Sequence, residues 1–159
     1  MRAILFLLVS FIAAGSAAAD VRIVGTAEAL DGDTLAFGPV RVRLHGVDAP
    51  EGDQTCRLEG EEWDCAGAAT ERLAAMVEGR EIECLVRDVD RYGRLVAACY
   101  ADGADVGEAL VRDGLAWAYR HYSLDYVAAE RAAKAARRGI WRGPAMPPWE
   151  WRKLQRAER

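Results

Sequence analysis

The sequence has few of the side chains that build a zinc site. It contains two histidines, His45 and His121, and four cysteines, none of which forms a Cys-x-x-Cys pair. Structural zinc sites are usually built from closely spaced pairs of cysteine and histidine. We therefore expect no zinc site, and the even number of cysteines favours disulfides instead.

The sequence also lacks an apolar run long enough to cross a membrane. Its most apolar stretch, residues 4–14, falls well short of the roughly 20 residues that a bilayer requires. This stretch follows the basic Arg2 and precedes the small-residue run at 17–19. That order predicts a secretory signal peptide over residues 1–19. We expect the mature protein to be secreted or periplasmic, with no membrane attachment after the signal is cleaved.

An excess of basic residues is absent as well. The chain has 25 aspartates and glutamates against 21 lysines and arginines, for a net charge of -4. A protein that binds nucleic acid usually carries a basic surface, because neutralising phosphates supplies much of its affinity. Such a substrate would have to be held here by a local group of basic side chains, helped by a cation among carboxylates.

No repeat, low-complexity tract or linker divides the chain, which predicts one domain over residues 20–159 with a short C-terminal tail. Alternating apolar residues and turn signals predict strands over 21–30, 34–37, 40–47, 81–86 and 95–100. Helical spacing and capping residues predict helices over 66–77, 105–111 and 125–139. This order is typical of an α+β domain in which five strands close into a Greek-key barrel, with three helices.

The cysteines lie where two disulfides can form. With residues 90–93 at the tip of a hairpin, Cys84 lies opposite Cys99, within reach of a disulfide. Cys56 and Cys65 close a short loop before the first helix. An exported protein meets an oxidising environment. Of the possible connectivities, we predict Cys56–Cys65 and Cys84–Cys99.

Three short polar stretches carry the candidate chemistry. They are Asp-Gly-Asp-Thr at 31–34, Arg-Leu-His-Gly-Val-Asp-Ala-Pro-Glu at 43–51, and Asp-Arg-Tyr-Gly-Arg at 90–94. Taken singly, each has an ordinary interpretation: a hairpin turn, a surface strand with ion pairs, and a polar hairpin tip. Their combination is more informative than any one of them.

Together the stretches supply what hydrolysis of a phosphodiester needs, which is a positioned phosphate, an activated water and stabilisation of the charge that develops on phosphorus. Asp33 and Asp48 offer the carboxylate oxygens that Ca²⁺ prefers. Arg43 and Arg94 have fork-shaped guanidinium groups that grip phosphate oxygens. Glu51 is a candidate base that directs the water.

These stretches, with residues 101–103, 108–112, 114–116 and 139–141, resemble the thermonuclease (staphylococcal nuclease) family. The similarity runs from about residue 24 to residue 141, and residues 54–66 are an insertion relative to the best-known member. The resemblance implies an OB-type five-stranded barrel with three helices. It also implies Ca²⁺-dependent cleavage of DNA and/or RNA, with water attacking in line with the leaving oxygen. Nothing in the sequence indicates a protein partner, and we expect a monomer.

The resemblance assigns roles only at positions that match the family's motifs. These positions are the catalytic Arg43, Glu51 and Arg94, the calcium carboxylates Asp33 and Asp48, the backbone carbonyl of Ala49 as a third calcium ligand, and Arg91, Tyr92 and Tyr119 as groups that hold the nucleotide's phosphate and base.

Two other functions are compatible with the fold. OB barrels often bind single-stranded nucleic acid without cutting it. An exported member could instead act on the cell envelope or on polysaccharide, since a fold does not determine an activity. The presence of Glu51 together with Asp33 and Asp48 favours the enzyme, because a binding module needs none of them.

Overall fold

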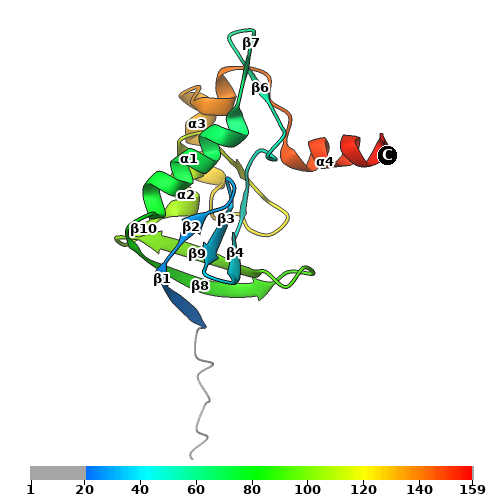
Figure 1. Cartoon of the computed structure of the whole chain (residues 1–159). Helices are drawn as coiled ribbons and strands as arrows, with labels where there is room; N and C mark the ends of the chain where they lie inside the picture. Colours follow the sequence, from blue (N-terminus) through cyan, green and yellow to red (C-terminus); the bar gives the residue numbers. More distant parts are fainter. Residues whose placement is uncertain (1–20, 159) are drawn as a thin grey trace, which may run out of the picture.

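The computed structural model describes residues 21–158, which form a curled sheet with helices on one side of it (Figure 1). The predicted signal peptide, residues 1–19, lies outside the described residues. The main sheet has seven strands, namely β1 (Arg22–Thr26), β2 (Glu28–Ala29), β3 (Thr34–Phe37), β4 (Val40–Leu44), β8 (Glu81–Val89), β9 (Leu95–Ala101) and β10 (Ala104–Asp105).

The order of the strands makes this sheet curl. The strands follow the path β1-β8-β9-β4-β3-β2, with β10 beside β9, and only the β4–β9 pair is parallel. β1 and β2 therefore lie at opposite ends of the path, yet Ala27 alone separates them along the chain. Because the two ends are joined by one residue, the sheet bends round until they meet. The prediction of an α+β, OB-type barrel is confirmed.

The hydrophobic core lies between the curled sheet and the helices α1 (Cys65–Val77), α2 (Val106–Arg112) and α3 (Val127–Ala135). Leu35 and Val42 point into it from the sheet, and Leu73 and Leu110 from the helices. Each predicted helix has its counterpart. Asp64 caps the start of α1, and its side chain accepts a hydrogen bond from the N–H of Gly67 at 2.7 Å.

Two predicted strands are each divided in the structure. The predicted strand 21–30 is divided at Ala27 into β1 and β2. The predicted strand 40–47 ends at Leu44, and Gly46, at φ 70, turns the chain out of the main sheet. Residues beyond it form β5 (Val47–Asp48), which pairs with β11 (Trp117–Ala118). Periodicity did not predict these breaks, because apolar residues continue across both.

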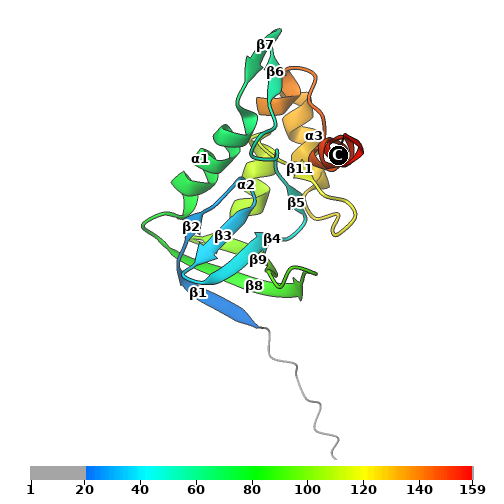
Figure 2. The ribbon, with the colours of Figure 1, turned by 45° about the vertical axis from the view of Figure 1, so that its right-hand side comes forward.

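The inserted segment 54–66 contains a small hairpin of its own. β6 (Cys56–Leu58) and β7 (Glu61–Trp63) pair with each other and project from the top of the molecule (Figures 1 and 2). The disulfide between Cys56 and Cys65 closes its base. Arg142 forms an ion pair with Glu59 in the turn, at 2.7 Å, and links the hairpin to the segment after α3.

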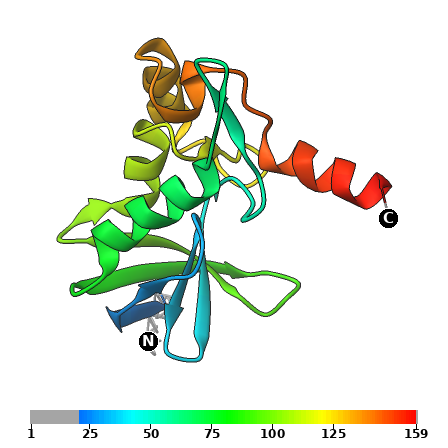
Figure 3. The same cartoon turned by 45° about the horizontal axis from the view of Figure 1, so that its top comes forward.

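The prediction of three helices is wrong for residues 21–158, which form four. The predicted helix 125–139 is limited to α3, and a 3₁₀ turn, η1 (Gly139–Arg142), follows it. A fourth helix, α4 (Pro148–Ala157), occupies the region assigned to the tail and projects from the same side of the molecule as the β8–β9 hairpin (Figures 1 and 3). Proline is well tolerated in a first helical turn, because the missing N–H has no partner there.

The two disulfides have the predicted pairings. Cys84 and Cys99 face each other across β8 and β9, with their Cα atoms 4.0 Å apart. Cys56 and Cys65 are joined with a Cα separation of 5.7 Å. Within residues 21–158, no helix has the length and apolar character that crossing a bilayer demands.

Candidate functional site

Two buried carboxylates share the guanidinium of Arg43. Arg43 Nη1 donates to Asp33 Oδ1 at 3.0 Å, and Nη2 lies 2.9 Å from Asp33 Oδ2. Nη2 also donates to Asp48 Oδ1 at 2.7 Å. The exposed fraction is 5% for Asp33 and 0% for Asp48. The structure thus brings together both predicted calcium carboxylates and one predicted catalytic arginine.

The local backbone geometry places Asp33 beside Arg43. Residue 34 pairs with Arg43 across β3 and β4, so Asp33 comes just before the strand that lies beside Arg43. Asp33 Oδ2 accepts the N–H of Ala49 at 3.1 Å. Gly32 permits this approach, because a Cβ there would lie 2.7 Å from the Cβ of Ala49. The Asp-Gly-Asp stretch is therefore a packing element of the site, and not only a turn.

The charges of this group are not fully balanced. Burial raises the pKa of Asp33 to about 7, although the nearby Arg43 acts to lower it. Burial lowers the pKa of Arg43, but Asp33 and Asp48 raise it by more, so the guanidinium stays charged. A buried carboxyl with a raised pKa marks a position where additional positive charge would be stabilised.

Arg94 is the last residue of the turn that joins β8 to β9. Its Nε donates to Asp90 Oδ2 at 2.7 Å, and the backbone N–H groups of Tyr92 and Arg94 donate to Asp90 Oδ1. Burial acts to raise the pKa of Asp90, but these hydrogen bonds hold it below its usual value. Val96, two residues beyond Arg94, pairs with Arg43 across β9 and β4. The two predicted catalytic arginines therefore come from neighbouring strands.

Glu51 is held at the mouth of the site by its backbone. Its N–H donates to Gln54 Oε1 at 3.2 Å, and its carbonyl accepts the Gln54 N–H at 2.8 Å. Gln54 is only 1% exposed, and its Nε2 donates to the carbonyl of Met146 at 2.6 Å. The Glu51 side chain stays partly exposed, at 34%. Gln54, which sequence reasoning did not single out, thus ties Glu51 to the segment that leads into α4.

Tyr119 belongs to an aromatic cluster. Its ring centroid lies 5.2 Å from Tyr122, 5.6 Å from Trp149 and 6.0 Å from His121. Its backbone N–H donates to the carbonyl of Gly46 at 2.8 Å, which holds the ring beside the turn after β4. Trp149 comes from α4, so this helix supports one side of the predicted base-binding residue.

A cleft of about 660 Å³ joins Arg43 to the other predicted catalytic and substrate-binding residues, whereas Asp33 and Asp48 are not among the residues that line it. Of the residues predicted for catalysis and substrate binding, all six line it: Arg43, Glu51, Arg91, Tyr92, Arg94 and Tyr119. Its charged lining consists of five arginines and three carboxylates, namely Arg43, Arg91, Arg94, Arg152, Arg156, Glu51, Asp88 and Asp90. The local basic group that an acidic nucleic-acid-binding chain requires is therefore present in the cleft.

Arg152 is the site residue that the sequence analysis missed. It projects from α4, and its guanidinium contacts Asp48 and Glu51. Burial lowers the pKa of Arg152, but hydrogen bonds to these two carboxylates raise it by more. The only local signal was the proline pair at 147–148, which is compatible with a helix start and was assigned to the tail.

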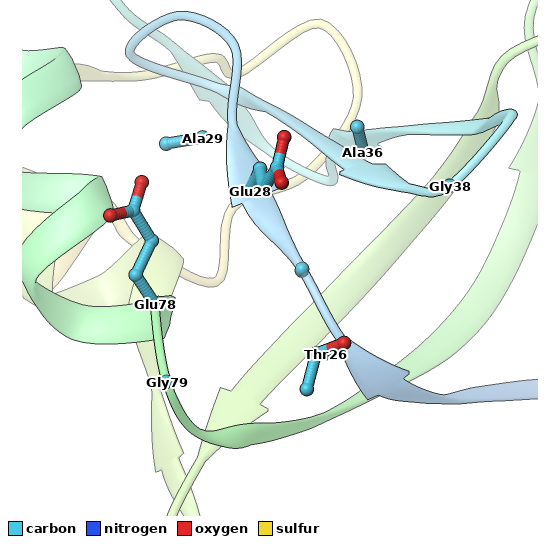
Figure 4. Close-up of a pocket in the computed structure, with 8 residues that line it drawn as sticks. Thr26, Glu28, Ala29, Ala36, Gly38, Glu78 and Gly79 are labelled. Carbon is cyan, nitrogen blue, oxygen red and sulfur yellow. The ribbon is translucent and has the colours of Figure 1, made fainter.

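A second groove, of about 500 Å³, lies where β1 passes into β2. Figure 4 shows Glu28 and Glu78 beside it, with Thr26 and Ala36 on its walls. None of the residues predicted to carry chemistry lines this groove. It contains no basic side chain, so it does not suit a phosphate.

The two carboxylates that pair with Arg43 fit a hard cation. Asp33 and Asp48 present carboxylate oxygens, the ligand type that Ca²⁺ prefers. The structure contains no group of three or more histidine, cysteine, aspartate or glutamate side chains able to hold a metal within residues 21–158. Two carboxylates alone leave positions for a backbone carbonyl, water and substrate oxygens. Asp33, whose pKa burial raises to about 7, is a carboxyl that a bound cation would keep ionised.

Several known proteins are similar to this chain in sequence. Residues 41–143 match the family model described as staphylococcal nuclease homologue. An uncharacterized endonuclease of Escherichia coli is 35% identical over 131 residues, which cover 77% of this chain and 80% of that protein. The micrococcal nuclease of Shigella flexneri is 32% identical over 145 residues, or 80% of this chain and 78% of that protein.

The match extends to a plant protein of different size. A probable staphylococcal-like nuclease of Oryza sativa subsp. japonica is 36% identical over 128 residues, which cover 79% of this chain but 36% of that protein. The match to the family model spans more than half of the chain, and it includes Arg43, Glu51 and Arg94. The chain belongs to the staphylococcal nuclease family.

Proposed function

We propose that this protein is an exported, Ca²⁺-dependent nuclease that hydrolyses phosphodiester bonds of DNA and/or RNA. The observation that supports it most is the position of Arg43, which pairs with the buried Asp33 and Asp48 and lines the same cleft as Glu51 and Arg94. Two relatives that match most of this chain are named as an endonuclease and a micrococcal nuclease. The geometry of the site and the sequence similarity to these relatives both support hydrolysis of phosphodiester bonds.

Each side chain has a role that its position suits. Asp33 and Asp48, with the backbone carbonyl of Ala49, would hold the cation. Bound Ca²⁺ supplies positive charge that helps to position a phosphate and stabilises the charge that develops on it. Arg43 lies against both carboxylates, so it reaches a phosphate oxygen next to the cation site.

Glu51 and Arg94 act on the reacting atoms. Glu51 is partly exposed at the mouth of the cleft, where its carboxylate accepts a proton from water and directs that water toward phosphorus. Arg94 donates to the phosphate oxygens as their negative charge grows, which stabilises the transition state more than the ground state. The planar guanidinium suits two phosphate oxygens at once.

The outer part of the cleft suits the rest of the nucleotide. Arg91 and Tyr92 stand at the tip of the β8–β9 hairpin, and Tyr119 lies on another wall. We propose that the arginine holds a terminal phosphate while the tyrosines stack against a base, an interaction that accepts any base. Tyr92 is 72% exposed, so a base can reach its ring.

The two disulfides support export, since such bonds persist in oxidising compartments such as the periplasm or the medium. The signal peptide and the monomeric state remain predictions. Mass spectrometry of the mature N-terminus and size-exclusion chromatography with light scattering test them. A mature chain that begins near residue 20 and runs as a monomer is the expected result.

Hydrolysis of single-stranded DNA across a Ca²⁺ titration tests the nuclease. We expect activity that rises with Ca²⁺ and disappears in chelator. Binding of the DNA without cleavage at saturating Ca²⁺ would favour the binding module instead. Full activity in chelator would exclude Ca²⁺ as the cofactor, and neither binding nor cleavage would favour a role outside nucleic acids.

A further inference from the structure

The C-terminal helix contributes Arg152 to the lining of the cleft, where it contacts two carboxylates. Arg152 Nη1 donates to Glu51 Oε1 at 2.5 Å and to Asp48 Oδ1 at 3.1 Å. Nη2 donates to Asp48 Oδ2 at 2.8 Å. Arg152 thus connects the residue proposed to direct water with a residue proposed to hold the cation.

Several contacts dock α4 so that Arg152 reaches this position. Gln54 binds the carbonyl of Met146, just before the helix. Trp149 packs its ring 6.5 Å from Trp117 and 5.6 Å from Tyr119. On the next turn, Trp151 Nε1 donates to Asp53 at 3.3 Å. These contacts all precede Arg152 along the chain, so its position follows from the docking of the start of α4.

The donors of Arg152 are not equivalent. Nη2 contacts Asp48 alone, whereas Nη1 contacts both carboxylates. Asp48 Oδ1 is already bound by Arg43, so a cation at Asp48 must share its oxygens with two guanidinium groups. Arg152 can give up Asp48 and keep Glu51, because a separate bond holds Glu51. Positive charge next to a cation site also opposes the cation.

We propose that Arg152 is a positioning residue of the site, which orients the Glu51 carboxylate and competes with the cation for Asp48. This inference rests on the proposed nuclease function. It makes α4, which lies beyond the family match at residues 41–143, part of the proposed active site. Removing Arg152 has two effects of opposite sign, one on turnover and one on cation affinity.

The test compares Arg152→Gln with the wild-type protein in two measurements. Turnover at saturating Ca²⁺ and saturating single-stranded DNA should fall by about 10–100-fold, the usual effect of losing a group that orients a functional side chain. The affinity for Ca²⁺ alone, measured by calorimetry without DNA, should rise several-fold because the Arg152 guanidinium no longer competes with Ca²⁺ for Asp48. KM for the DNA should change less than kcat, since Glu51 is not proposed to bind the substrate.

Two further variants separate positioning from simple support of the helix. Lys153→Gln removes an equal charge from the neighbouring position, which is exposed and forms no hydrogen bond or ion pair within residues 21–158, and it should leave both measurements unchanged. Arg152→Lys keeps the positive charge but replaces the two-nitrogen fork with a single ammonium nitrogen, so its turnover should lie between those of wild type and Arg152→Gln. Circular dichroism and thermal unfolding confirm that each variant is folded.

The outcomes are distinct. An unchanged turnover in Arg152→Gln, or a fall in Ca²⁺ affinity that parallels the fall in turnover, overturns the inference. An equal fall of turnover in Lys153→Gln also overturns it, because the fall then results from the loss of any positive charge on α4. If Arg152→Gln proves unfolded, full turnover in a folded Arg152→Lys overturns the inference and an intermediate turnover supports it. Absence of Ca²⁺-dependent cleavage by the wild type refutes the nuclease, whereas an active wild type with an equally active Arg152→Gln refutes only the positioning role.

Discussion

Asp33 Oδ2 accepts the backbone N–H of Ala49 at 3.1 Å, which joins the turn before β3 to the segment that follows β5. Through this bond the side chain of one proposed calcium ligand holds the backbone of another. Gly32 supports the same contact, because any Cβ there would meet Ala49 at 2.7 Å.

The ionisation of Asp33 should make the metal-free protein less stable as the pH rises. Burial raises the Asp33 pKa to about 7, against 3.8 for the free side chain, so between these values the native state holds a proton that the unfolded chain has lost. The stabilisation is full below about pH 4 and is lost as the pH approaches 7. The loss amounts to at most about 4 kcal/mol.

Urea unfolding from pH 4 to pH 8, without Ca²⁺, measures this effect. Asp33→Asn should remove most of the decline between pH 4 and pH 7, because the amide does not titrate. With Ca²⁺ present, the wild type should regain stability at neutral pH, since the cation binds the ionised form. Identical pH profiles for wild type and Asp33→Asn in chelator would contradict the prediction.

Substitution at Gly32 should loosen the junction. In Gly32→Ala the new Cβ would lie 2.7 Å from Ala49 Cβ and 2.8 Å from Ala69 Cβ, so the turn or helix α1 must shift. We expect a loss of about 1–3 kcal/mol in the free energy of unfolding, as for other overpacked sites. Affinity for Ca²⁺ should fall as well. Gly52→Ala is the control, because nothing lies within 4 Å of a Cβ at that position.

Removing Glu51 or Arg94 should abolish most of the turnover without unfolding the protein. Both side chains are partly exposed in the cleft and outside the core, so Glu51→Gln and Arg94→Ala leave the packing intact. Each should reduce kcat by about 10²–10³-fold, by analogy with the loss of a donor to a developing negative charge. Hydrolysis of single-stranded DNA at saturating Ca²⁺ measures it. A fully active Glu51→Gln protein would remove this residue from the mechanism.

The exposed Arg41, two residues before Arg43 on β4, provides a matched control. Arg41→Ala lowers the positive charge by the same amount as Arg94→Ala, but it does not line the cleft. We expect its kcat to stay close to that of the wild type. A similar fall in both variants would indicate that overall charge, and not the position of Arg94, controls turnover.

Loss of the Tyr119 ring should weaken binding of a nucleotide more than turnover. Tyr119→Ala should cost about 1–3 kcal/mol in the affinity for a nucleoside bisphosphate, the usual contribution of a stacked base. The ring also packs against Trp149, so a change in tryptophan fluorescence should accompany the substitution. Calorimetry with the bisphosphate and steady-state kinetics test this together. Unchanged affinity with a large fall in kcat would contradict a base-stacking role.

The sequence alone determined the parts of the site that depend on neighbours along the chain. The alternation over 40–44 faces Arg43 away from Val42, and a predicted hairpin put Cys84 opposite Cys99. The three polar stretches, read as a combination, indicated Asp33, Asp48 and Glu51. Each of these patterns can be recognised within a few neighbouring residues, because side chains alternate along a strand with a period of two residues.

Only the tertiary structure showed how α4 completes the cleft. Arg152 is separated from Asp48 by 104 residues and from Glu51 by 101, and Gln54 reaches Met146 across 92. Periodicity and spacing carry no information about contacts at such separations, which depend on how the packed elements orient one another. The helix itself is short, and helices of this length are stabilised chiefly by packing. Local sequence therefore indicated the carboxylates and arginines from residue 33 to residue 94, while the docking of residues 148–157 against them was decided by the fold.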